Sequence, residues 1–166
     1  MTDTVTCSIC GRIHAKEKSE LVFRMPDPIF DLSKDEREKR CDIDDDFCAI
    51  DRQRLFIRGL LPIPVHGRTE PYRIGLWVEV DEATFGEICR LWEDPAQAEH
   101  PPLRGVLAND VPLVPKTFRL AVSIQLAGPK TRPAFYLVSE DHPLSGEQRR
   151  GIDAHRALEY TDSTNS

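Results

Sequence analysis

The sequence predicts an α+β fold: a mainly antiparallel sheet, two or three packed helices and a small zinc-knuckle-like element at the N-terminus. Apolar and polar residues alternate along 72–80 and again along 118–126, as in strands with one buried face. Between them, four apolar residues recur at the helical spacing: Phe85, Ile88, Cys89 and Trp92. The 166 residues fit one domain, which we place at 1–160, with a disordered polar tail at 161–166.

Short elements are expected before the first long strand. Residues 5–14 begin with a brief alternation and reach a glycine, which is typical of a strand entering a tight turn and forms the knuckle. Another short strand is expected at 21–23. Ser33, followed by Glu36 three residues later, is a capping box, and it begins a polar helix that ends near Arg40 and lies on the surface.

Strands dominate the middle of the chain. We expect strands at 47–50 and 55–65, the second being the antiparallel partner of 72–80. Because proline cannot donate a ladder hydrogen bond, Pro62 and Pro64 indicate that 55–65 reaches a sheet edge or a bulge.

The remaining elements alternate between helix and strand. Asp81 can cap the first apolar-striped helix, whose stripe packs on the sheet. A loop at 93–102 leads to a short strand at Val106 and Leu107, and the strand 118–126 is followed by its antiparallel neighbour. That neighbouring strand is expected at 134–138. Two helices follow it: one is capped by Asp141 and ends near Arg150, and the other is capped by Asp153 and ends at Tyr160.

The charge balance narrows the class of partner. The chain has 22 basic and 28 acidic residues, a net charge of −6, which opposes binding to nucleic acid or to an anionic membrane and favours a partner protein with a basic surface. No run approaches the roughly 18 apolar residues that span a bilayer. The first residues lack the basic start and apolar run of a signal peptide, so we expect a cytoplasmic protein.

Five cysteines in such a chain indicate reduced thiols rather than a disulfide framework. Cys7 and Cys10 are two residues apart, and such thiolates can occupy two corners of a tetrahedral zinc site. The spacing allows two closed sets: Cys7, Cys10, His14 and Cys48, or Cys7, Cys10, Cys41 and Cys48. The alternatives are ordinary reduced cysteines near a strand end and a redox pair, although Gly11 and charged residues follow Cys10 where a redox motif has a helix.

The acidic run between the two later cysteines has a second interpretation. Asp42, Asp44 and Asp46 match the first ligand positions of a calcium-binding EF-hand loop, but Phe47 replaces its glycine and Gln53 its bidentate glutamate. We therefore interpret the run as a solvated acidic loop that can attract a basic partner surface.

Catalytic motifs are absent from the sequence. It has no nucleophile elbow, phosphate-binding glycine loop, zinc-protease motif or dinucleotide fingerprint. His142, at the start of a predicted helix, is the candidate general base, although a local role at the helix start is the favoured explanation. Trp77, on the more polar face of its strand, either packs beneath a helix or loop or marks a binding surface.

Short motifs follow one another in a characteristic order. They are 7–11 with His14, 46–51, 56–59 leading to 63–65, 75–78, 91–95, 107–109, 141–144, 147–149 and 151–152. Because these motifs occur together in this order, the chain resembles the bacterial domain of unknown function 2199 family over nearly its whole length. The resemblance implies that Cys7, Cys10, His14 and Cys48 form the metal set and that Cys41 is incidental. It implies no activity.

These observations favour a non-enzymatic protein-binding domain with a structural Zn²⁺ ion, of which an immunity protein that masks a basic toxin is one concrete form. The alternative is a metal-dependent hydrolase, in which zinc keeps an open position for water or His142 acts as base. A zinc-ribbon nucleic-acid binder is the third class, and the net charge of −6 disfavours it.

Overall fold

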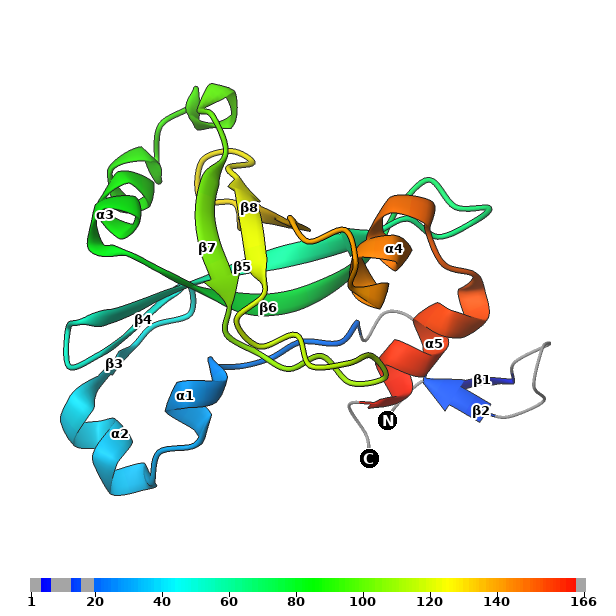
Figure 1. Cartoon of the computed structure of the whole chain (residues 1–166), viewed down its shortest axis with the longest axis horizontal. Coiled ribbons are helices and arrows are strands. Elements are labelled where there is room, and N and C mark those ends of the chain that lie inside the picture. Colours follow the sequence, from blue (N-terminus) through cyan, green and yellow to red (C-terminus); the bar gives the residue numbers. More distant parts are fainter. Residues whose placement is uncertain (1–3, 7–12, 16–19, 164–166) are drawn as a thin grey trace.

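The computed structural model describes residues 4–6, 13–15 and 20–163, and it contains both helices and strands, so the chain has an α+β fold (Figure 1). The strands are β1 (Thr4–Thr6), β2 (Ile13–Ala15), β3 (Cys41–Ile43), β4 (Phe47–Ile50), β5 (Arg54–Ile63), β6 (Tyr72–Val80), β7 (Leu103–Leu107), β8 (Ala121–Gln125) and β9 (Ala134–Leu137). The helices are α1 (Asp27–Phe30), α2 (Lys34–Arg40), α3 (Glu82–Leu91), the 3₁₀ helix η1 (Gln97–Glu99), α4 (Pro143–Arg150) and α5 (Ala154–Asp162).

Seven strands form one mixed sheet in the order β3-β4-β5-β6-β7-β8-β9. Each strand is antiparallel to the next, and a parallel contact between β5 and β9, at Leu60 and Ala134, closes the last five strands into a small barrel. Five successive antiparallel strands leave the first and last running in the same direction, so the closing pair has to be parallel. The strands β3 and β4 extend beyond the barrel as a hairpin.

The longest ladder joins β5 to β6, with Leu55 opposite Val80 and Ile63 opposite Tyr72, which confirms the pairing expected from the sequence. Gly59 lies where β5 approaches β9. A Cβ there would collide with the ring of Phe135 and lie 2.7 Å from the carbonyl oxygen of Pro133. Barrel closure therefore requires a residue without a side chain at this point.

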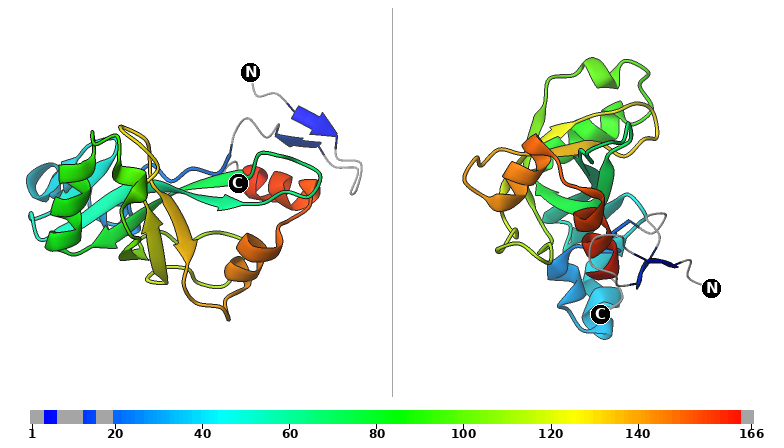
Figure 2. Two further views of the ribbon diagram at one scale, coloured as in Figure 1. Left: turned by 90° about the horizontal axis from the view of Figure 1, so that it is seen from above. Right: turned by 90° about the vertical axis from the view of Figure 1, so that its right-hand side faces the viewer.

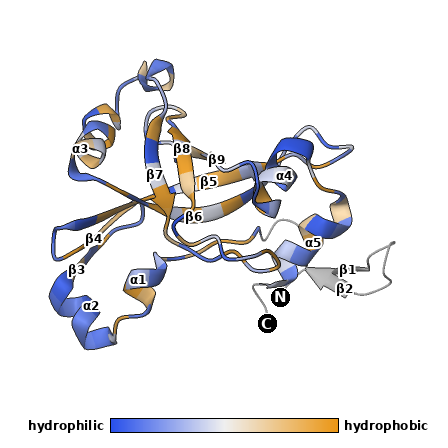
Figure 3. Ribbon diagram, in the orientation of Figure 1, coloured by the Kyte–Doolittle hydropathy of each residue, from blue (hydrophilic) through white to orange (hydrophobic). Residues whose placement is uncertain are grey.

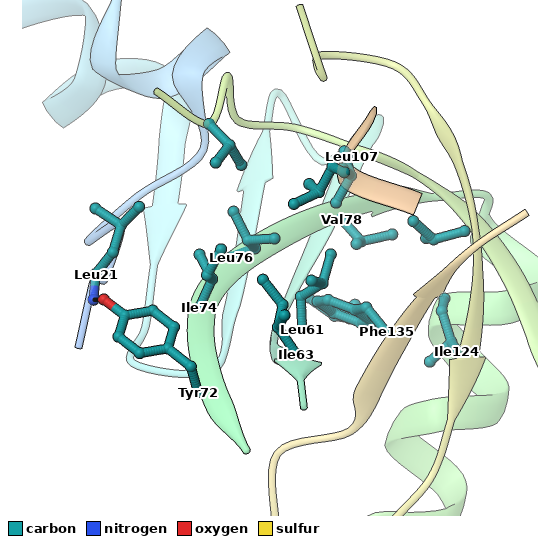
Figure 4. Packing of buried hydrophobic residues seen from close by; sticks show 14 of the residues in the cluster. Leu21, Leu61, Ile63, Tyr72, Ile74, Leu76, Val78, Leu107, Ile124 and Phe135 are labelled. Carbon is teal, nitrogen blue, oxygen red and sulfur yellow. Dashed lines mark hydrogen bonds between the residues drawn. The ribbon is translucent and has the colours of Figure 1, made fainter. Parts of the chain in front are cut away.

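Two buried clusters occupy the two faces of β5 and β6. The barrel interior holds Leu61, Ile74 and Phe135, each with 0% of its surface exposed (Figure 4). The outer face carries Phe56 and Trp77, which pack with residues of α1 and β4 in a second cluster. The complete burial of Trp77 confirms that it packs beneath other elements rather than marking an open surface.

The hydroxyl of Tyr72 links the segment before α1 to the last helix, α5. It accepts the backbone N–H of Leu21 at 2.8 Å (Figure 4). It also lies 2.9 Å from the hydroxyl oxygen of Thr161 in α5. Burial raises the pKa of Tyr72, so the phenol stays protonated at neutral pH. These hydrogen bonds hold Leu21 and α5 against β6.

Three of the expected helix caps are confirmed. The side chains of Ser33, Asp81 and Asp153 accept the backbone N–H groups of Glu36, Thr84 and Arg156. None of the residues of α2 is buried, as expected for a surface helix, and its ribbon is hydrophilic along its length (Figure 3).

The helix α4 begins one residue later than expected, because its cap is His142 rather than Asp141. The ring nitrogen Nδ1 of His142 accepts the N–H of Leu144 at 3.0 Å, and Pro143 occupies the first helical position. At the other end, α5 continues two residues past Tyr160, and Thr161, which we had assigned to the tail, is buried.

Further expectations differ from the structure. The strand expected at 118–126 begins only at Ala121, because Leu120 donates to the carbonyl of Thr117 in a turn where Arg119 has a φ of +74°. Cys89, expected in the buried stripe of α3, is exposed, because Ile88 and Leu91 form the buried centre of that helix. The elements α1 and β3 were not expected, and the five α-helices of the described residues exceed the predicted two or three.

The β1–β2 hairpin lies against α5, at the end of the molecule opposite β3 and β4 (Figures 1 and 2). Because Cys7 and Cys10 lie outside the described residues, the zinc-knuckle-like form of this element stays a prediction. Among the residues that the structure describes, every helix is too short or too polar to cross a bilayer.

Candidate functional site

Of the four residues expected to bind zinc, Cys48 is the one whose side chain the structure describes. Cys7 and Cys10 are outside the described residues, and His14 lies in β2, whose backbone alone is described. Cys48 is buried in β4, and its Sγ lies 3.8 Å from the carbonyl oxygen of Asp44. The structure does not bring Cys48 together with β2, so the four-residue site stays a prediction.

Among the cysteines that the structure describes, Cys41 lies on the strand paired with that of Cys48. It lies opposite Ile50 in the β3–β4 ladder, and Ile43 lies opposite Cys48, so both thiols are on the same face of the hairpin at diagonal positions. Burial raises the pKa of Cys48 to about 11 and also raises that of Cys41, so both are neutral thiols at physiological pH in this structure. Within the described ranges, no group of three or more His, Cys, Asp or Glu side chains is arranged to hold a metal.

The β3–β4 hairpin and the turn after it are strongly acidic. Residues 41–53 contain five aspartates and one arginine, a net charge of −4 out of −6. At its turn, Asp46 donates its N–H to the carboxylate of Asp44 at 3.4 Å. The Asp42 side chain is 74% exposed and only loosely paired with Arg52 at 3.9 Å. The acidic loop expected from the sequence is therefore present, as the turn of an edge hairpin.

Two arginines from the barrel hold this turn in place. Arg58 of β5 lies over the ring of Trp77 at 5.5 Å and donates to the carbonyl oxygen of Asp45 at 3.2 Å. Arg132, from the loop before β9, donates to the carboxylate of Asp46 at 3.3 Å. Burial, together with the charge of Arg132, lowers the pKa of Arg58. The anchoring engages Asp46 and leaves the carboxylates of Asp42, Asp44 and Asp45 facing solvent.

An open groove of about 550 Å³ lies between the hairpin and α3, and we call it the hairpin groove. Its apolar floor is formed by Phe47, Leu55 and Phe85, and the rings of Phe47 and Phe85 meet edge-to-face at 5.6 Å between centroids. Its rim carries Asp42 and Asp44. Asp42 points to the groove side because it lies opposite Ala49, which in turn lies opposite Leu55.

The other candidate, His142, has both ring nitrogens occupied. Nδ1 accepts the N–H of Leu144, and Nε2 lies 3.0 Å from the carbonyl oxygen of Pro115, to which only a protonated nitrogen can donate. No nitrogen is left to take a proton from a substrate. His142 therefore joins α4 to the loop before β8, and the geometry does not favour it as a general base.

The neighbouring motif residues are also engaged within the fold. Gln148 donates from Nε2 to the carbonyl oxygens of Pro62 and Phe135 and accepts the N–H of Leu137. Glu147 accepts from Tyr160 at 2.6 Å and from Arg156 at 2.9 Å. The motif at 141–152 thus attaches α4 to the barrel through Gln148 and to α5 through Glu147.

A family model described as an uncharacterized protein conserved in bacteria (DUF2199) matches residues 6–152. The chain belongs to this family. No curated protein and no solved structure matches it. The family match spans the β3–β4 hairpin, the groove, Arg58 and Arg132 as well as α4, and it assigns no role to any of them.

Sequence reasoning missed the anchoring arginines and the groove. The available signal for Arg58 was its place between Ile57 and Gly59 in an otherwise apolar strand, where a charged side chain needs a specific partner. The groove floor joins residues from β4, β5 and α3, and no spacing rule connects Phe47 to Phe85.

Proposed function

We propose that the chain is a non-enzymatic protein-binding domain whose β3–β4 hairpin contacts a basic surface of another protein. The observation that carries this proposal is the hairpin groove, in which an apolar floor lies directly beside exposed carboxylates. A lysine or arginine side chain matches both parts, since its aliphatic stem covers apolar surface while its charged end meets a carboxylate. An immunity protein that masks a basic toxin is the concrete form of this function that we favour.

The decisive experiment is co-expression with the products of adjacent genes, followed by size-exclusion chromatography at low and high salt. We expect a basic neighbour to form a complex that dissociates at high salt, because exposed charge pairs are screened. Replacing Asp42 and Asp44 by asparagine should weaken the complex about tenfold, since two charge pairs are lost without changing side-chain size.

A matched control is available at the other end of the molecule. The double substitution E140Q/D141N removes the same number of charges from exposed residues near α4, and it should leave the affinity unchanged. If both double variants bind the partner as tightly as the unmodified chain, the hairpin is not the binding surface and the proposal is wrong.

A structural zinc ion on Cys7, Cys10, His14 and Cys48 is the second part of the proposal. It is supported by the Cys-x-x-Cys-Gly-x-x-His spacing and by the family resemblance. His14 and Cys41 compete for the fourth position, and Cys41 already lies on the same face as Cys48.

Elemental analysis of the purified chain tests this part. We expect one zinc per chain, lost when Cys7, Cys10 or Cys48 is replaced by serine. Loss with H14A and retention with C41S assigns the fourth ligand to His14, and the opposite pattern assigns it to Cys41. A chain that contains no zinc after purification without chelator contradicts a structural site.

A further inference from the structure

The outer edge of β3 presents backbone groups that have no partner among the described residues. Asp51 donates its N–H to Arg40 at 2.8 Å, and Asp44 donates to Phe47 at 2.9 Å, so the even-numbered residues of β3 and its flanks face β4. Alternate residues of a strand direct their backbone groups to opposite sides. The N–H and carbonyl of Ile43 and the carbonyl of Cys41 therefore point outward, whereas the N–H of Cys41 caps α2 by donating to Arg37.

No strand of the described residues pairs with this edge, since β3 is the first strand of the sheet order. The exposed edge also carries apolar surface, because the Ile43 side chain is 50% exposed. Such an edge is a ready template for another extended segment, which gains main-chain hydrogen bonds and contacts for alternate side chains.

We propose that the partner binds as an added β-strand along β3, through an extended segment that alternates basic with apolar residues. This inference rests on the function proposed above. In this arrangement the basic side chains lie on the groove side, where their stems cover Phe47 and Phe85 and their charged ends meet Asp42 and Asp44. The apolar side chains lie on the opposite face, beside Ile43.

Charge decides between a foreign segment and a second copy of this chain. Pairing two copies through β3 would bring together two hairpin regions that each carry a net charge of −4. Like charges directly across a strand pair are destabilising, whereas lysine or arginine opposite these aspartates is stabilising. The occupant that fits the edge is therefore a basic segment of another protein.

The anchoring described above prepares the edge for binding. Arg58 and Arg132 hold the turn between β3 and β4, so the hairpin has little conformational freedom to lose when a strand is added. A pre-formed edge lowers the entropic cost of association.

The probe for the experiment is an eight-residue peptide of alternating lysine and valine, acetylated and amidated at its ends. Its matched control has the same sequence with N-methyl groups on alternate amides, which remove the donors along one strand edge. Binding of both to the full chain is measured by fluorescence anisotropy at low salt. We expect the unmodified peptide to bind, to protect the Ile43 amide from hydrogen exchange, and to bind at least about tenfold more tightly than the methylated peptide.

A second arm changes the chain instead of the peptide. Ile43→Pro removes the outward N–H without touching the hydrogen bonds to β4, and it should weaken binding of the unmodified peptide about tenfold. Ile43→Val keeps the N–H and should bind within about twofold of the unmodified chain. The peptide comparison keeps the proposal testable even when Ile43→Pro perturbs the hairpin.

The outcomes separate the two proposals. Equal binding of both peptides, or binding of neither, overturns strand addition. The basic partner surface nevertheless stands if the co-expressed complex still depends on Asp42 and Asp44. If that complex does not depend on these aspartates while the unmodified peptide alone binds and protects Ile43, the edge accepts a strand but the partner proposed above is wrong.

Discussion

Carboxylates and arginines meet at two ends of the molecule, with different consequences. Beside α4 and α5, Glu147 is 17% exposed and Arg156 27% exposed, and they are 2.9 Å apart. At the β3–β4 hairpin, Asp42 is 74% exposed and Arg52 90% exposed, and they are 3.9 Å apart. The same chemistry thus stabilises the fold at the first end and is available to a partner at the second.

Substitutions in the barrel interior should have the largest effect on stability. Phe135→Ala removes a fully buried ring at the β5–β9 closure, and we expect it to lower the free energy of unfolding by about 3–5 kcal/mol. Ile43→Ala, at the half-exposed hairpin edge, should cost less than about 1 kcal/mol. Urea denaturation followed by circular dichroism measures the free energy of unfolding of both variants. Equal losses would contradict the expected difference in stability between the barrel interior and the hairpin edge.

Two glycines should respond with opposite signs to the same substitution. Gly59→Ala forces a methyl group against Phe135 and a backbone oxygen, and we expect a loss of about 3 kcal/mol. A Cβ at Gly86 in α3 meets nothing within 4 Å, so Gly86→Ala should gain about 0.5–1 kcal/mol by reducing the entropy of the unfolded chain. A neutral Gly59→Ala variant would contradict the close approach of β5 to β9.

Neutralising one carboxylate in each region compares them directly. Glu147→Gln weakens the hydrogen bonds from Tyr160 and Arg156 in a partly buried site, so it should cost about 1–2 kcal/mol. Asp42→Asn should change the stability by less than about 0.5 kcal/mol, because its contact with Arg52 is exposed to solvent. Thermal unfolding of both variants at low ionic strength measures the two losses of stability. Equal losses would contradict the expected difference between the two regions.

Acid should slightly lower the stability of the fold at Asp51, the residue that follows the β3–β4 hairpin. The hydrogen bonds from Arg40 lower the pKa of Asp51, so the folded chain favours the carboxylate. The Asp51 carboxylate contributes its full stabilisation when the pH is above the pKa of aspartate in the unfolded chain, about 3.9. This stabilisation is lost as the pH falls through the lower pKa that Asp51 has in the folded chain. A carboxyl carbon NMR titration of Asp51 measures the shift, and Arg40→Gln should return the pKa to its ordinary range. An unchanged titration in that variant would assign the shift to another cause.

Local patterns in the sequence predicted the regular elements well. The caps at Ser33, Asp81 and Asp153 and the pairing of β5 with β6 follow from side-chain chemistry and from the alternation of apolar residues, both of which act over short distances. The three-residue strand β3 is too short for any alternation to be recognised. The β5–β9 closure depends on Gly59 and Phe135, which no local pattern connects.

The candidate site was predictable in its charge and not in its shape. The aspartates at 42–46 indicated an acidic surface, and the structure gives it an edge strand and an apolar floor. The floor requires Phe85 to reach the hairpin from α3, and the turn requires Arg132 from the loop before β9. These contacts arise from tertiary packing, which spacing along the chain does not encode.

The hydroxyl of Tyr72 has a practical consequence for measuring these properties. It ties Leu21 to Thr161, and α5 lies at the end of the molecule opposite the β3–β4 hairpin (Figure 1). A linker attached to Thr69, in the exposed turn between β5 and β6 at the same end as α5, would hold the chain on a sensor surface with the hairpin directed away from the support (Figure 1). Truncation before Thr161, by contrast, would take away a partner of the Tyr72 hydroxyl and loosen the segment at Leu21.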